Sequence, residues 1–410
     1  MSPKRTTRRT GALALIAVFG LAIVASPSAE GQTFKVLYRF GPYPDGNSPL
    51  GGLLMDAAGN LYGTTKYGGS HVGCPGKWQC GAVFKLDTNG VETVLYNFAG
   101  PDGSNPTSDL IMDANGDLYG TTEFGGDTGS CVGTSYAGCG VVFKLSGTNE
   151  TVVYRFTGGG DGAFPWPGVI MDAHGALYGT TNKGGAAGGG VAFKLVGKKE
   201  TVLHSFCSEN NCKDGTYLTS GLIMDPNGNL YGTAAFGGDV NCDYPNGCGV
   251  VFKLTGKKET VLYSFKNPPD GENPLAGLFM DATGNLYGTT ADGGSGNGGT
   301  VFELNLGDKE RVLHRFVPYG KRHDGFSPGT AVVRDASGNL YGSTEEPGGG
   351  VAYEITADGK EKILHYFCSE KDCADGAYPS DLIMDSKGNL YGTAAGGGIN
   401  SNGTVFMITP

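Results

Sequence analysis

The stretch Leu110–Thr122, with the sequence LIMDANGDLYGTT, constrains the fold most because it recurs seven times. Its Leu-Tyr-Gly core returns with the tyrosine at positions 62, 119, 178, 231, 287, 341 and 391. A repeat of this length indicates a single supersecondary unit that packs against copies of itself, so the repeat outweighs the several domains that chain length alone would suggest.

Each repeat contains four short segments of β-branched and aromatic residues bounded by Gly, Asn and Asp, which is typical of strands. In the second repeat we expect strands A, B, C and D at Leu110–Asp113, Leu118–Thr122, Val141–Leu145 and Thr151–Phe156. Apolar residues nowhere follow a sustained 3.6-residue period, so we expect essentially no helix beyond the N-terminal leader.

The turn between strands A and B carries an Asp and a Gly in every repeat. In the fourth repeat it reads Asp225-Pro226-Asn227-Gly228, a type I turn signature in which the Asp oxygen accepts backbone N–H groups. Sevenfold recurrence assigns this hairpin to the scaffold, because a site for one ligand should break the symmetry.

The two ends of the repeat region predict a closed ring. It begins with a D-type strand, Phe34–Phe40, and ends with a C-type strand, Val405–Ile408. The first D strand has no A, B and C strands before it, and the last A, B and C strands have no D strand after them. We therefore predict an all-β, seven-bladed β-propeller of four antiparallel strands per blade, one domain over 33–410, in which the N-terminal strand completes the last blade.

Residues 1–29 have the pattern of a signal peptide. Four basic residues precede the apolar run Gly11–Ala25, which is short for a membrane span, and small residues follow it. A twin-arginine route through Arg8-Arg9 is a weaker alternative. We expect a secreted or periplasmic/extracellular protein without a membrane span in the mature chain.

The net charge of the chain indicates which classes of partner it can bind. The formal net charge is −10, and no basic stretch follows the leader. This argues against nucleic acid as a partner. Glycine accounts for 74 of 410 residues without a collagen period, which suits a turn-dense all-β chain.

Ten cysteines fall into five close pairs. Repeats that lack one member of a pair also lack the other, which predicts local disulfides in an oxidising compartment. A zinc site is the alternative, but most gaps exceed the usual ligand spacing, so we predict neither a metal nor another cofactor. The predicted pairs are Cys74/Cys80, Cys131/Cys139, Cys207/Cys212, Cys242/Cys248 and Cys368/Cys373.

The motifs Gly59–Thr65 (GNLYGTT), the Val-Phe-Lys-Leu strand and Thr93–Phe98 (TVLYNF) resemble those of the GloVer-type (Gloeo/Verruco) tandem-repeat proteins. The resemblance covers the chain from Phe34 onwards and implies an exported repeat protein. It implies no particular activity.

Candidate site residues lie where the repeats differ. In a propeller meander the B–C and D–A connections share one face, and here they hold all five cysteine pairs. Aromatic side chains on this face suit sugar stacking or protein anchoring, although each could instead pack its own loop. Glu345 and Glu346 near Arg334 are the departure in repeat 6 and could serve as acid/base groups or metal ligands. Neighbouring strand residues point to opposite sides, so we favour a solvated charge cluster or internal salt bridge over a dyad. The candidates are Tyr67, Trp78, Phe124, Tyr136, Trp166, Phe236, Tyr244, Glu345 and Glu346.

An Asp-Gly pair recurs in every D–A connection. A ring of seven carboxylates could bind a cation, but a capped turn explains each one locally, so we favour the turn. These aspartates are Asp45, Asp102, Asp161, Asp214, Asp270, Asp324 and Asp375.

Two functions fit the sequence. We favour a monomeric binding or scaffold module that recognises a glycan or protein ligand through the disulfide-bearing face, because no catalytic motif is recognisable. The alternative is an extracellular hydrolase or lyase with an acidic site at the channel mouth.

Overall fold

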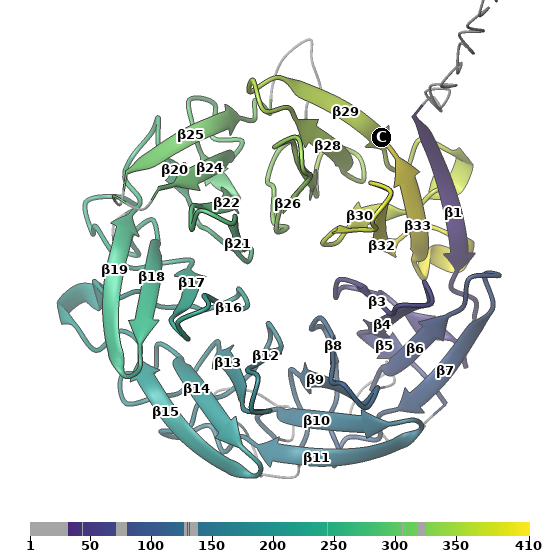
Figure 1. The fold of residues 1–410 in the computed structure, drawn as a ribbon, viewed down its shortest axis with the longest axis horizontal. Helices are drawn as coiled ribbons and strands as arrows, with labels where there is room; N and C mark the ends of the chain where they lie inside the picture. The colour runs from purple at the N-terminus through teal and green to yellow at the C-terminus, as the bar shows by residue number, and fades with distance from the viewer. Residues whose placement is uncertain are drawn as a thin grey trace, which may run out of the picture. The chain divides into compact units, whose positions relative to one another are not determined.

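The computed structural model describes residues 32–42, 44–70, 80–126, 129, 131, 138–243, 245–305, 307, 309–318 and 325–410. Residues 32–410 form one compact unit. Within it, seven antiparallel sheets of the predicted A–B–C–D type surround a central axis (Figure 1). The predicted seven-bladed β-propeller is confirmed.

The blades consist of the following strands. Blade 1 holds β3 (Leu54–Met55), β4 (Leu61–Thr65), β6 (Ala82–Leu86) and β7 (Glu92–Asn97). Blade 2 holds β8 (Ile111–Met112), β9 (Leu118–Thr122), β10 (Val141–Ser146) and β11 (Asn149–Arg155). Blade 3 holds β12 (Val169–Met171), β13 (Leu177–Thr181), β14 (Val191–Val196) and β15 (Lys199–Ser205). Blade 4 holds β16 (Ile223–Met224), β17 (Leu230–Ala234), β18 (Val250–Thr255) and β19 (Lys258–Ser264).

Blade 5 holds β21 (Phe279–Met280), β22 (Leu286–Thr290), β24 (Thr300–Leu304) and β25 (Glu310–Arg315). Blade 6 holds β26 (Val333–Arg334), β27 (Leu340–Thr344), β28 (Val351–Ile355) and β29 (Glu361–Tyr366). Blade 7 holds β31 (Ile383–Met384), β32 (Leu390–Gly396), β33 (Thr404–Thr409) and β1 (Thr33–Arg39). Short strands in the connections are β2 (Gly46–Asn47), β5 (Tyr67–Gly68), β20 (Gly271–Glu272), β23 (Asp292–Gly293) and β30 (Ala377–Pro379).

The ring closes where the sequence predicts. Strand β1 pairs antiparallel with β33, with Thr33 opposite Thr409 and Arg39 opposite Thr404. Figure 1 shows the two strands side by side. Pairing the first strand with the last removes the two free edges that an open array would expose.

Large aromatic rings join each blade to the next. The phenylalanine that follows each D strand meets the aromatic residue of the next blade's C strand, with ring centroids 5.1 Å apart for Phe40 and Phe84 and 4.9 Å apart for Phe367 and Phe406. The C-strand ring also explains the glycine of Leu-Tyr-Gly, because a Cβ on Gly63 would lie 2.7 Å from Cζ of Phe84. Both Phe40 and Phe84 are buried, so these contacts form the core between blades.

The A–B hairpins have the predicted turn. The Oδ1 atom of Asp113 accepts the backbone N–H groups of Asn115 and Asp117 at 2.9 and 3.0 Å, and Gly116 has a φ of 83°. The Tyr119 hydroxyl donates to Oδ2 of the same aspartate at 3.2 Å. The equivalent tyrosine–aspartate bond occurs in the other six blades.

Helical structure is limited to three short 3-10 turns among the described residues: η1 (Asn210–Cys212), η2 (Lys371–Cys373) and η3 (Ile399–Ser401). The expectation of essentially no helix is thus met in the described part of the chain. In that part no helix is long and apolar enough to cross a membrane.

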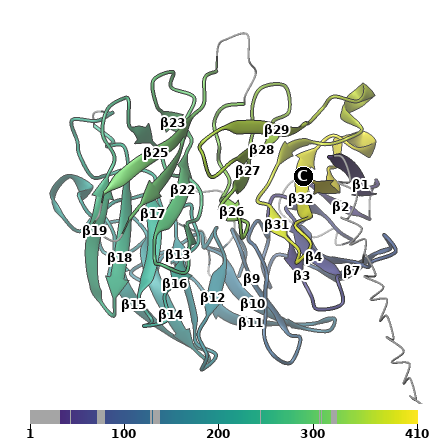
Figure 2. The ribbon, with the colours of Figure 1, turned by 45° about the horizontal axis from the view of Figure 1, so that its top comes forward.

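The connections divide between two faces, which we call the turn face and the loop face. Antiparallel order in every sheet puts the A–B and C–D turns at one end and the B–C and D–A connections at the other. The latter two also pair directly, as in Gly46 with Gly68 and Gly271 with Gly293. Figure 2 shows the loops near β23 at the top and the β14–β15 turn at the bottom.

Candidate functional site

A cavity of about 580 Å³ opens along the axis on the loop face. Its walls are the D–A connections just before each A strand, and all seven blades contribute at least one residue. A ring of hydrogen bonds fixes these connections, because the hydroxyl residue after Leu-Tyr-Gly, a serine in blade 6 and a threonine elsewhere, donates to a carbonyl of the next blade, as Thr64 does to Ser108 at 3.1 Å. Among the described residues Thr121 is the exception, and its hydroxyl has no partner. It lies in the blade before the one that carries Trp166.

Two aspartates lie in this cavity at equivalent positions of blades 2 and 7. Asp109 and Asp381 immediately precede the first core leucine of their A strands, where the other five blades have Gly or Ala. Oδ1 of Asp109 accepts the N–H of Gly52 at 2.5 Å, and Oδ1 of Asp381 accepts the N–H of Ala331 at 2.7 Å. A Cβ on Gly52 would lie 2.9 Å from Oδ1 of Asp109 and 3.2 Å from Cβ of Asp381, so both aspartates flank the same residue of blade 1.

The surroundings of these carboxyl groups disfavour two negative charges. Burial within the ring raises the pKa of Asp109, and burial together with the charge of Asp109 raises the pKa of Asp381. Asp109 is nevertheless exposed to the cavity and Asp381 is half-buried. The groups therefore border a space that water can enter from the loop face.

Aromatic side chains form part of the cavity wall. Tyr217 and Tyr378 follow the same Gly-x pattern in blades 4 and 7 and adopt left-handed backbone conformations, with φ of 64° and 60°. Serine or asparagine occupies this left-handed position in four blades, as Asn105 does. A large residue with positive φ is uncommon and often marks a functional site. Trp166 of blade 3 is the third aromatic residue of the wall.

Two disulfides lie just before these tyrosines. The D–A connections Cys207–Tyr217 and Cys368–Tyr378 have nearly the same sequence, FCSENNCKDGTY and FCSEKDCADGAY when the preceding phenylalanine is included. The bridges Cys207–Cys212 and Cys368–Cys373 are present, as predicted. Each closes a tight loop directly ahead of an aromatic residue of the cavity.

Three further bridges were predicted in the B–C loops. Cys131–Cys139 and Cys242–Cys248 are present, and Cys80 is disulfide-bonded. Cys74, its predicted partner, lies outside the described residues. The sulfur atoms of Cys242 and Cys248 lie near Glu272, but because the two cysteines are bonded to each other this group does not form a zinc site.

Blade 6 places a buried hydroxyl on the axial side. Tyr353 of β28 occupies the position that is Phe in the other six blades and is fully buried. Its ring extends across Gly342 of the more central β27, where a Cβ would lie 2.4 Å from the hydroxyl oxygen. That oxygen has no hydrogen-bond partner among the described residues. Burial, followed by the carboxylates of Glu361 and Asp381, raises the pKa of Tyr353.

The structure brings only part of the predicted set together. Trp166 and Glu345 line the cavity, whereas Glu346 pairs through its backbone with Phe326 and does not. The two adjacent glutamates are therefore divided between the cavity and the rim and do not form a dyad. Burial, and then the neighbouring Glu346, raises the pKa of Glu345.

The remaining described aromatics lie at the rim. Phe124 packs edge-on against Phe164 at 5.4 Å, and Phe236 contacts Tyr217 at the same centroid distance. Tyr67 lies in the equivalent position of blade 1, 5.7 Å from Nζ of Lys66. These three rings support their own loops, and only Phe236 touches the cavity wall. Trp78, Tyr136 and Tyr244 lie outside the described residues.

The recurrent Asp-Gly aspartates act as turn caps. Asp102, for example, accepts the N–H of Ala99 at 2.8 Å and the hydroxyl of Tyr96 at 2.5 Å. In the connections that lead into blades 4 and 7 a histidine of the preceding blade replaces the tyrosine, as His204 of blade 3 does beside Asp214 at 3.1 Å. Six of the seven aspartates are described and make such bonds, while Asp324 lies outside the described part.

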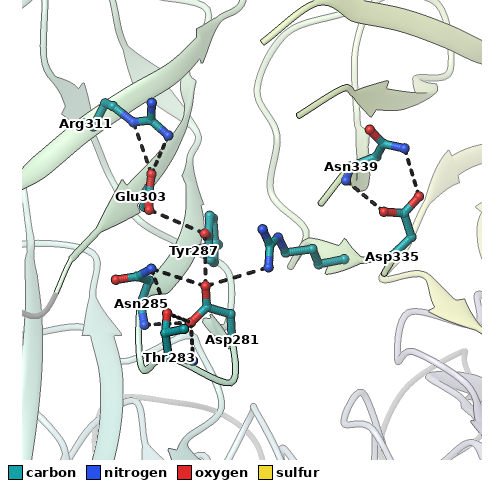
Figure 3. A network of polar contacts seen from close by, with 9 residues as sticks. Asp281, Thr283, Asn285, Tyr287, Glu303, Arg311, Asp335 and Asn339 are labelled. Atoms are coloured by element: carbon teal, nitrogen blue, oxygen red, sulfur yellow. Dashed lines mark hydrogen bonds and ion pairs between the residues drawn. The ribbon is translucent and has the colours of Figure 1, made fainter. Parts of the chain in front are cut away.

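A separate polar network lies on the turn face between blades 5 and 6 (Figure 3). Arg334, which replaces the methionine of strand A, lies 3.7 Å from Asp281 of blade 5. Glu303 accepts from Arg311 at 2.6 Å and from Tyr287 at 3.4 Å. Every carboxylate of this network has a partner within the chain, which favours a structural role for it.

The sequence pattern of the Gloeobacter/Verrucomicrobia repeat matches residues 18–137, 75–243 and 242–410. No curated protein matches the sequence. Similar solved structures include the extracellular domain of BT4673 from B. thetaiotaomicron, with 10% identity and a TM-score of 0.55 over 91% of this chain and 39% of that one.

Two further structures are similar at lower TM-scores. A protein of unknown function from Dyadobacter fermentans has 11% identity and a TM-score of 0.49 over 92% of this chain and 98% of that one. The gluconolactonase XC5397 from Xanthomonas campestris has 14% identity and a TM-score of 0.44 over 92% and 89%. The likeness to BT4673 supports the fold alone, whereas the repeat matches extend over most of the sequence. The chain therefore belongs to the Gloeobacter/Verrucomicrobia repeat family.

Proposed function

We propose that this protein is an exported binding module that takes a glycan into the axial cavity of the loop face. The disulfides suit an extracellular location, and the predicted signal peptide would direct the chain there. The observation that carries the proposal is the composition of the cavity wall, which combines aromatic faces with carboxylates. Sugars stack their apolar C–H faces on such rings and donate hydroxyl protons to such oxygens.

The size and rigidity of the cavity support this proposal. A volume of about 580 Å³ lies in the usual range for small-ligand sites and suits a short oligosaccharide. The wall is held by inter-blade hydrogen bonds and, beside Tyr217 and Tyr378, by disulfides. A wall fixed before binding reduces the entropy lost when the ligand is bound.

The test is a glycan-array screen followed by calorimetry on the best ligand. We expect Trp166→Ala to lower the affinity at least about tenfold, since a stacked aromatic ring contributes on the order of 1–2 kcal/mol or more. Tyr366→Ala is the matched control, because Tyr366 is an exposed aromatic residue of the outermost strand β29 that does not line the cavity. Absence of glycan binding, or binding that Trp166→Ala leaves unchanged, would overturn the proposal.

A hydrolase or lyase is the second candidate, and Asp109 and Asp381 are the observation that favours it. A pair of carboxyl groups with raised pKa values in one cavity is a common basis for general acid–base catalysis. Incubating the protein with the bound glycan and analysing the products by mass spectrometry distinguishes the two candidates. Cleavage that Asp109→Asn abolishes supports an enzyme, and an unaltered glycan supports a binding module.

A further inference from the structure

We propose that the ligand of the axial cavity carries a positively charged amino group, so that the cavity selects sugars with a free amine over neutral sugars of the same shape. This inference rests on the proposed function and specifies its ligand.

The charge of the cavity wall is the first argument. The described residues of the wall include Asp109, Glu345 and Asp381 and no lysine, arginine or histidine. A carboxylate without a nearby cation is unusual at the position of Glu345. The equivalent residue of blade 2, Glu123, forms an ion pair with Lys66 of blade 1 at 3.4 Å. The blades on either side of Glu345 have Ala291 and Ala395 where blade 1 has that lysine. The ligand is left to supply the positive charge.

The two aspartates provide the second argument. Each uses one oxygen to accept a backbone N–H, from Gly52 or from Ala331. Neither Oδ2 atom is hydrogen-bonded to another described residue, and both residues border the cavity. The five blades with Gly or Ala at this position demonstrate that the fold does not require a carboxylate there. An ammonium group has three N–H donors and can satisfy both free oxygens at once.

The aromatic wall decides between an organic ammonium and a bare metal ion. Trp166 and Tyr378 line the wall, and aromatic rings attract organic cations and also pack against a sugar ring. The ring of Tyr217 is already occupied, because Nζ of Lys183 lies 5.1 Å from its centroid. A hard metal ion takes oxygen ligands only and gains nothing from aromatic rings. Carboxylates together with aromatic rings therefore fit an amino sugar better than a metal ion.

The test compares three β-1,4-linked trisaccharides by calorimetry at about pH 7, where an amine of this kind is still mostly protonated and Asp381, with a pKa raised to about 7, is ionised in about half of the molecules. The probes are the trimers of glucosamine, N-acetylglucosamine and glucose, which differ chiefly at C2. We expect the glucosamine trimer to bind at least about tenfold more tightly than either neutral trimer. Equal or weaker binding of the glucosamine trimer would overturn this inference while leaving glycan binding intact. Failure of all three, together with a blank glycan array, would overturn the proposed function itself.

Charge-neutralising variants separate site binding from general attraction to an acidic protein. Asp109→Asn and Asp381→Asn should reduce the preference for the amine to less than about threefold. Glu346→Gln removes the same charge from the same face outside the cavity and should leave the preference unchanged. Asp109→Gly copies the residue of blades 1, 3, 4 and 5, so it tests the carboxylate in a sequence that the fold accepts. If these aspartate variants keep the full preference, the assignment is wrong.

Discussion

The guanidinium group of Arg334 in blade 6 lies over the ring of Tyr287 in blade 5, 5.2 Å from the ring centroid. In blades 1 to 4 a lysine of the same blade has this role, as Lys85 does above Tyr62 at 5.5 Å. Blade 5 has Glu303 in place of that lysine, so its neighbour provides the cation. Figure 3 shows Tyr287 between Glu303 and Asp281 in this network.

Arg334→Met, which restores the methionine of the other blades, should therefore destabilise the protein. The variant leaves the half-buried Asp281 and the ring of Tyr287 without the guanidinium group of Arg334, and we expect a loss of about 1–2 kcal/mol in the free energy of unfolding. Urea denaturation followed by tryptophan fluorescence measures the effect. The double variant Glu303→Lys/Arg334→Met rebuilds the arrangement of blades 1 to 4 and should recover most of the loss. If the double variant is no more stable than Arg334→Met, the cation is not what blade 5 requires.

Closure of the ring can be tested at Phe40. This ring follows the closing strand β1, is fully buried, and meets Phe84 of blade 1 at 5.1 Å. Phe40→Ala should cost about 3–5 kcal/mol through lost burial and the cavity left behind. Scanning calorimetry should give a single transition at lower temperature. A cost like that of a surface substitution would contradict the role assigned to this contact.

Stability should decrease as the pH rises from about 5 to 8. Burial is the main reason why the pKa values of Glu92, Glu150, Glu259 and Glu310 rise to about 7 in the folded protein. An unfolded glutamate titrates near 4.3, so the folded state binds more protons in this window. The stabilisation is complete below the unfolded pKa and is lost as the pH passes through the folded one.

Urea midpoints measured across that range test the sign. The double variant Glu150→Gln/Glu310→Gln should flatten the profile, because it removes two of the titrating groups. The A–B turn aspartates act in the opposite sense. In Asp113, burial opposes the shift, but hydrogen bonds from the backbone of Asp117 and Asn115 lower the pKa, so its contribution is lost only in stronger acid. A midpoint that rises between pH 5 and 8 would contradict the assignment.

The disulfides should differ in whether they mainly support the stability of the protein or the shape of the cavity. Cys368–Cys373 is half-buried and closes a short loop beside Tyr378, so Cys368→Ser/Cys373→Ser should cost about 2 kcal/mol or less in stability. If the cavity binds a ligand, this variant should weaken binding about tenfold, because Tyr378 loses its support. Cys131→Ser/Cys139→Ser is the contrast, because both cysteines are buried in a hydrophobic cluster. It should lower the unfolding temperature more and the affinity less, and the reverse order would refute this division.

The scaffold is predictable from the sequence because the same strand and turn motifs recur in all seven repeats. Strand β9 occurs at the predicted Leu118–Thr122, and the strand count correctly pairs β1 with β33. Strand A is shorter than predicted, with Ile111–Met112 in place of Leu110–Asp113, because Asp113 is already committed to the turn. Hydrogen-bonding demands of a turn are hard to weigh against strand propensity from sequence alone.

The site is less predictable, although its signal is present. Asp109 and Asp381 break the repeat at a position that is otherwise Gly or Ala, and Tyr353 breaks a run of Phe. Each is a single substitution within a strand or directly before one. In the sequence such a substitution is harder to recognise than a long loop that contains a tryptophan. Convergence on the axis depends on the ring geometry, and only the folded ring shows that blades 2 and 7 point their aspartates into one space.

The pairing of β1 with β33 also determines when the ring can close. Because the partner of β1 is β33, a nascent chain cannot close the ring before β33 has been made. A product truncated before Thr404 would keep two unpaired sheet edges, one at each end of the array. Such edges aggregate or attract proteases. The seam therefore acts as a quality-control checkpoint, because only a chain that contains both β1 and β33 can hide both edges.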